Sequence, residues 1–104
     1  MGQYYFDMGE YQKSILYFEE SKQASMNKKD FDRALKAEEM IGKATIYVSA
    51  QNYLDEANKY LSEENYDKAY SAYNNAIDIY EKLGDRKKIS LIQNNMLKIV
   101  IFGV

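Results

Sequence analysis

Residues 65–85 read NYDKAYSAYNNAIDIYEKLGD, and this stretch decides the fold. Its apolar and aromatic side chains recur at steps of three and four residues, which is the spacing of one face of an α-helix. The members of this face are Tyr66, Ala69, Tyr70, Tyr73, Ala76, Ile77 and Tyr80. Small alanines alternate with large tyrosines, so the helix can approach a neighbour closely while rings fill the gaps. Asn65 is expected to cap its start through a side-chain oxygen, and Gly84 to end it with a positive φ.

The composition predicts a single all-α domain covering residues 1–104. The chain is 46% hydrophobic and 29% charged, which is typical of a globular protein rather than a disordered one. It contains no proline, the residue that most strongly interrupts helices. No stretch shows the sustained alternation of Val, Ile and Thr that indicates strands. The fold class that follows is all-α.

Helical spacing and breakers divide the chain into about six helices. Asp30 is expected to cap the third, and Gly42 inside it predicts a close approach of another backbone, because glycine costs about 1 kcal/mol there relative to alanine. Asn27 is expected to end the second helix. The expected helices lie at residues 2–8, from Tyr11 into the polar run 25–29, at 31–49, 52–61 and 66–83, and after Asp85.

An internal repeat is the most informative feature of the sequence. A shift of about 55 residues places Tyr5 on Tyr60, Tyr11 on Tyr66, Lys13 on Lys68 and Asp30 on Asp85. Identities are few, but small residues fall on small ones and large on large ones at the packing positions. Such a pattern predicts helical hairpins that stack and share one core.

This pattern resembles the tetratricopeptide repeat, and in particular its subclass with longer helices. The residues that carry the resemblance are Tyr53, Ala57, Tyr60, Asn65-Tyr66-Asp67-Lys68-Ala69, Tyr73, Ala76 and the link Leu83-Gly84-Asp85. Glu56 replaces the family's usual leucine, and the 55-residue spacing exceeds the family's 34 to about 40. An array of hairpins like that of the soluble NSF attachment proteins fits equally well. The resemblance implies an α-solenoid of antiparallel helix pairs, either complete here or part of a longer array.

The residue types weigh against catalysis, cofactors and metals. The sequence has no histidine and no cysteine, so the commonest general base and the usual zinc ligands are missing. Its acidic pairs, such as Glu19-Glu20 and Glu38-Glu39, are adjacent on helices and point about 100° apart. The segment Leu83-Gly84-Asp85 is followed by basic residues, but it lacks the glycine-rich spacing of a phosphate-binding loop. We expect no enzyme activity, no cofactor and no metal.

Charge and hydropathy indicate which classes of partner and which cellular location to expect. A net charge of −2 opposes nucleic-acid binding, which usually needs a basic surplus. The longest apolar run, Met96–Val104, is about half of a membrane span and contains Lys98. Nothing resembles a signal peptide. The expectation is a cytoplasmic protein without nucleic-acid or membrane partners.

The resemblance implies a concave groove that holds an extended peptide or a partner helix. The side chains that it assigns to the groove are Gln3, Glu39, Lys43, Tyr47, Asn58, Asn94 and Lys98. Asparagine can bond a peptide backbone as donor and acceptor, and lysine can meet a carboxylate. The set of lysine, asparagine and arginine that grips terminal carboxylates in some family members is not reproduced. The competing interpretation of each residue is an ordinary polar surface position.

The apolar C-terminal segment supports a second hypothesis. Leu97, Ile101 and Phe102 extend the apolar surface of the last helix beyond one face. A single neighbour could not cover that area, so we expect a symmetry mate, another chain or further residues of a longer array to do so. The two hypotheses are therefore a scaffold that binds a protein or peptide without catalysis, and a structural module that self-associates through this helix.

Overall fold

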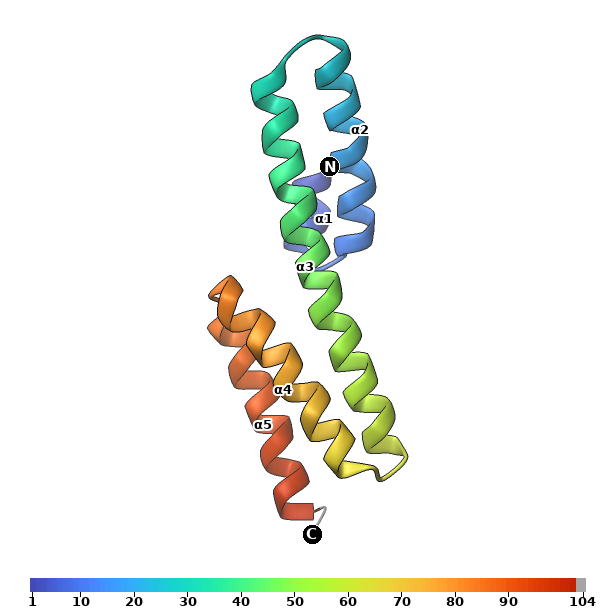
Figure 1. Ribbon diagram of the computed structural model, residues 1–104, viewed down its shortest axis with the longest axis vertical. Helices are drawn as coiled ribbons and strands as arrows, with labels where there is room; N and C mark the ends of the chain where they lie inside the picture. The colour runs from blue at the N-terminus through green and yellow to red at the C-terminus, as the bar shows by residue number, and fades with distance from the viewer. Residues whose placement is uncertain (103–104) are drawn as a thin grey trace. The chain divides into compact units, whose positions relative to one another are not determined.

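A computed structural model of the chain describes residues 1–102, and it describes side chains up to Ile99. Every regular element in this part of the chain is an α-helix, so the predicted all-α class is confirmed. The helices follow one another through short turns (Figure 1). Their bounds are α1 (Gly2–Asp7), α2 (Tyr11–Asn27), α3 (Phe31–Ser62), α4 (Tyr66–Leu83) and α5 (Arg86–Phe102).

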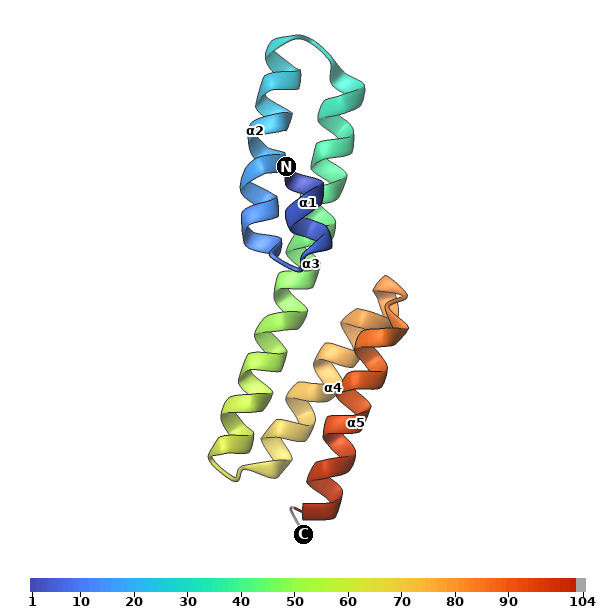
Figure 2. The same ribbon diagram turned by 180° about the vertical axis from the view of Figure 1, so that it is seen from behind.

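The chain divides into two compact units, Met1–Val48 and Ser49–Val104. Helix α3 passes through the boundary, so its first part belongs to the first unit and its last part to the second. In the first unit, α1 lies beside α2, and in the second, α4 and α5 run side by side in opposite directions (Figure 2).

The separate helices expected at 31–49 and 52–61 are one helix, so the described residues form five helices rather than about six. The sequence between Val48 and Asn52 contains neither glycine nor proline, and Ala50 within it is fully buried. Asn52 lowers helix propensity only by a few tenths of a kcal/mol, which packing overrides. The helix therefore continues through the expected break.

Aromatic rings form much of the core of the first unit. The ring of Tyr47 stacks on that of Tyr11, with centroids 4.6 Å apart and planes 15° apart. The ring of Phe6 meets both of them edge-on, at 5.2 Å from Tyr11 and 5.5 Å from Tyr47. Buried alanines of α3, among them Ala44, let the helices approach closely enough for these contacts.

Alanines and two tyrosines form the core of the second unit. Ala57, Ala69 and Ala76 are completely buried, and Tyr73 and Tyr80 are the largest side chains that are almost fully enclosed. The alternation predicted for residues 65–85 is confirmed at Ala69, Tyr73, Ala76, Ile77 and Tyr80, all of which are buried. Tyr70 is 38% exposed, so its predicted place on this face is wrong, and Ala72 is buried although it was not predicted. From α5, Ile92, Met96 and Ile99 complete this core.

The helix ends agree with the sequence in part. Gly84 has φ +73 and ends α4 as expected, and the backbone N–H of Arg33 donates to Asp30 Oδ1 over 3.3 Å. Asn65 stands at the start of α4 but makes no side-chain capping bond, contrary to the expectation. Gly42 also differs from the expectation. A Cβ added there would meet no atom of the described residues within 4 Å, so no backbone in that part of the chain approaches it. The expected close contact at Gly42 is wrong.

The turns before and after α2 have counterparts on either side of α4. Gly9 and Glu64 both have positive φ, as do Lys29 and Gly84, and the members of each pair lie 55 positions apart. The bond from Glu10 N to Tyr5 O (2.9 Å) corresponds to that from Asn65 N to Tyr60 O (2.8 Å). The Nζ atoms of Lys13 and Lys68 lie over the rings of Tyr5 and Tyr60, each 5.6 Å from the ring centroid.

Candidate functional site

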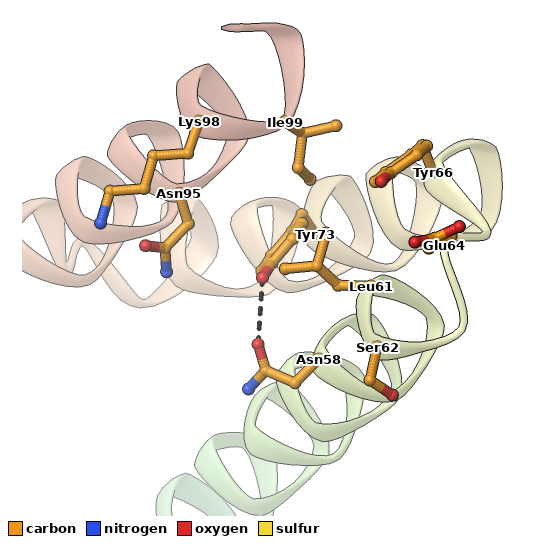
Figure 3. A pocket seen from close by; sticks show the side chains of 9 residues that line it. All are labelled: Asn58, Leu61, Ser62, Glu64, Tyr66, Tyr73, Asn95, Lys98 and Ile99. Carbon is orange, nitrogen blue, oxygen red and sulfur yellow. Dashed lines mark hydrogen bonds between the residues drawn. The ribbon is translucent and has the colours of Figure 1, made fainter. Parts of the chain in front are cut away.

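The second unit contains a pocket of about 530 Å³ between the end of α3, α4 and α5 (Figure 3). Its wall combines apolar side chains with amide, hydroxyl and charged groups. The lining residues are Asn58, Leu61, Ser62, Glu64, Tyr66, Tyr73, Asn95, Lys98 and Ile99.

Tyr73 and Asn58 form the hydrogen bond at the base of this pocket. The Tyr73 hydroxyl donates to Asn58 Oδ1 over 3.0 Å (Figure 3). Burial raises the pKa of Tyr73 above its usual value, because a phenolate would lose hydration there. The hydroxyl therefore keeps its proton and remains a donor at neutral pH. Since the Asn58 oxygen accepts this bond, the amide nitrogen is the group that Asn58 presents to a ligand.

The opposite wall comes from α5. Asn95 and Lys98 are exposed and lie three residues apart, which places them on one face of the helix. In Figure 3, Asn95 and Asn58 lie on two sides of Tyr73 and project from different helices. Amides on two sides of an apolar floor can bond the N–H and C=O groups of a peptide, and Lys98 can meet a carboxylate.

The structure brings only part of the predicted groove set together. Asn58 and Lys98 line the same pocket, as the resemblance implied. Asn94 is exposed on α5 but is not among the lining residues, and its neighbour Asn95 takes that place. Sequence reasoning missed Asn95, although its three-residue spacing from Lys98 was a signal that could have identified it.

The other predicted groove residues belong to the first unit. Gln3 and Glu39 line a separate pocket of about 500 Å³. The Nζ of Lys43 lies 5.6 Å from the centroid of the Phe6 ring. Tyr47 is 8% exposed and stacked on Tyr11, so its ring is part of the core and offers little surface to a ligand.

The residues predicted to form an oligomer interface are only partly described. Leu97 is 58% exposed and lies beside Tyr70, Ile77 and Met96 around a shallow hollow of about 470 Å³. The side chains of Ile101 and Phe102 lie outside the described residues.

Among the described residues, no group of three or more acidic side chains could hold a metal ion. No helix in that part of the chain has the length and apolar character needed to cross a membrane. Comparison of the chain with models of protein families, with curated proteins and with solved structures found no match.

Proposed function

We propose that this chain is a non-catalytic scaffold that binds a peptide segment of a protein partner in the pocket of the second unit. The observation that carries the proposal is the placement of Asn58 and Asn95 on two helices around the Tyr73 ring, with Lys98 beside them. These groups recognise peptide amides and one carboxylate, which is the chemistry of an extended peptide. The absence of histidine and cysteine from the sequence favours binding over catalysis.

We further propose that the architecture is of the tetratricopeptide type, with two copies of one helical unit. Burial supports this assignment, because Ala57, Ala69, Ala76 and Tyr73 stand at the small and large positions of the family pattern and are all enclosed. The recurrence of turn geometry at 55 positions also supports it. Stacked helical units of this type present concave surfaces that bind partners.

Peptide selection followed by calorimetry tests the binding proposal. Peptides selected from a displayed random library on the intact chain are expected to bind through the second unit. Asn95→Ala should weaken that binding about tenfold, because a buried peptide group would lose its hydrogen bond. Asn94→Ala is the matched control, since its side chain is exposed on the same helix outside the pocket. Equal losses in both variants, or a library that yields no binder, would refute the proposal.

Self-association is the second candidate, and the exposure of Leu97 and Leu91 on α5 favours it. Leu97 lies beside Tyr70 and Ile77 around a shallow hollow, and contiguous exposed apolar surface is typical of protein contacts. Light scattering at about 100 µM should then give more than the monomer mass, and Leu97→Lys should restore the monomer, because a buried lysine would lose hydration. A monomeric wild-type chain at this concentration would exclude self-association.

A further inference from the structure

The first unit has its own pocket, of about 500 Å³, formed by α1, α2 and the first part of α3. Phe18, Ala37 and Met40 give the pocket an apolar part, and its charged side chains all come from α3. The lining residues are Gln3, Phe18, Ser21, Arg33, Lys36, Ala37, Glu39 and Met40.

This pocket is lined in part by residues that correspond in sequence to those of the pocket in the second unit, but its chemistry differs. Three of its lining residues lie 55 positions before three that line the other pocket, and the pairs are Gln3 with Asn58, Phe18 with Tyr73, and Met40 with Asn95. A phenyl ring replaces the phenol, and a thioether replaces an amide. The floor of the first pocket therefore suits an apolar side chain, where the second pocket offers amide groups.

Glycine at position 2 closes the α1 side of the floor. A Cβ added to Gly2 would lie 3.0 Å from the Phe18 ring, which is closer than ordinary contact. The α1 backbone therefore approaches Phe18 directly, and Gly2 itself is buried. Phe18 is only half-buried, so the other side of its ring remains accessible from the pocket.

Two cations stand one turn apart on α3 at the edge of this floor. Arg33 Nε lies 3.4 Å from Asp30 Oδ2, but the two side chains are 81% and 43% exposed. An exposed pair of this kind contributes little, so Arg33 can turn to a ligand carboxylate instead. Lys36 has no ion pair within the described residues and is exposed. Glu39, about one turn further along α3, disfavours a second carboxylate at that end.

The geometry points to a second peptide-binding site in the first unit, specific for an apolar side chain followed directly by a carboxylate. The apolar side chain lies against Phe18, Ala37 and Met40, while Lys36 and Arg33 hold the carboxylate. The inference shares with the proposed function only the assumption that the partner is a peptide. It adds a second site of different specificity, so the chain is a two-site scaffold.

Titration of the ¹⁵N-labelled full chain with blocked hexapeptides tests this site. The probe is acetyl-Ser-Gly-Leu-Glu-Gly-Ser-amide, and its two controls carry Gln for Glu or Ser for Leu. We expect saturable shifts at the amides of Phe18, Lys36 and Met40, and none at Asn58 or Tyr73. Each control peptide should bind about tenfold more weakly, because one loses the ion pair and the other the apolar contact.

The variant Lys36→Gln should prefer the Glu peptide over the Gln peptide less strongly than the wild-type chain does, because Arg33 alone remains to hold the carboxylate. Its matched control is Lys28→Gln, another exposed lysine that lies outside the pocket, and this control should retain the full preference for Glu. Circular dichroism of both variants checks that the helices remain. Equal affinity of the wild-type chain for the Glu and Gln peptides would overturn the inference, as would the absence of any shift. Peptide binding confined to Asn58 and Tyr73 would refute this second site while leaving the proposed function intact.

Discussion

Ser14 is a buried hydroxyl in the first unit. It is completely enclosed, and its Oγ has no hydrogen-bond partner within the structure. Ala69, 55 positions later, is equally enclosed, and its methyl group needs no hydrogen-bond partner. Burying a hydroxyl without a hydrogen-bond partner costs free energy, because the group loses its hydrogen bonds to water and gains none within the protein.

We expect Ser14→Ala to stabilise the fold by about 1 kcal/mol, through the lost desolvation cost and the better helix propensity of alanine. The free energy of unfolding in urea measures this effect. Ser21→Ala on the exposed side of α2 is the matched control, and only the smaller propensity gain should appear there. A Ser14→Ala variant no more stable than this control would show that Ser14 finds a partner in solution.

Tyr73 gives the fold a dependence on alkaline pH. Its pKa is raised by burial above the ordinary value of 10.0, so the folded chain holds the phenolic proton more tightly than the unfolded chain. The contribution to stability is therefore complete below about pH 10 and is lost as the pH rises through the folded pKa.

Tyr73→Phe removes this titration together with the hydrogen bond to Asn58. At about pH 8 the variant should be less stable than wild type by about 1 kcal/mol, and by about pH 11 the difference should shrink or reverse. Urea unfolding at the two pH values tests the shift. A difference that stays constant between them would contradict the assignment to Tyr73.

At the scale of the element, α3 is one helix of 32 residues with a glycine in its interior. Among residues 1–102, no atom lies within 4 Å of a Cβ added at Gly42, so a methyl group there meets open space. We expect Gly42→Ala to stabilise the chain by about 1 kcal/mol through helix propensity alone. Thermal unfolding followed by circular dichroism measures the change.

Gly84→Ala serves as the opposite test at a helix end. Its φ of +73 is a conformation that an L side chain adopts only at a cost, although a Cβ there would meet no atom. The same substitution should therefore destabilise by about 1 kcal/mol. If Gly42→Ala and Gly84→Ala change the free energy of unfolding in the same direction, the different backbone conformations of the two glycines do not determine the effect of the substitution.

The two units of the whole molecule differ in the quality of their cores. Helix α4 buries six side chains, including Tyr73 and Tyr80, whereas α2 buries Tyr11 and two serines. Local opening exposes less apolar surface where fewer apolar groups are enclosed, so it costs less free energy. We predict that backbone amides of α2 exchange with solvent faster than those of α4. Native-state hydrogen exchange by NMR tests this order, and equal protection of the two helices would contradict it.

Periodicity and composition determined the all-α class, most of the buried face of residues 65–85 and most helix ends, because these depend on spacing and local chemistry. The continuous α3 and the uncrowded Gly42 did not follow from the sequence, since packing at Ala50 and open space at Gly42 are properties of neighbours. The same holds for the candidate site. Asn58 and Lys98 could be named in advance, but the choice of Asn95 over Asn94 depends on which side of α5 faces Tyr73.

The sequence by itself determined that the chain is helical and that it has no histidine or cysteine. Only the tertiary structure decided which polar residues share a pocket and which aromatic rings are enclosed. The physical reason is that helix periodicity is set by neighbours three and four positions away, whereas a pocket joins side chains from three helices. Tyr47 illustrates the difference: its position suggested a groove, and its contacts with Tyr11 and Phe6 place it in the core.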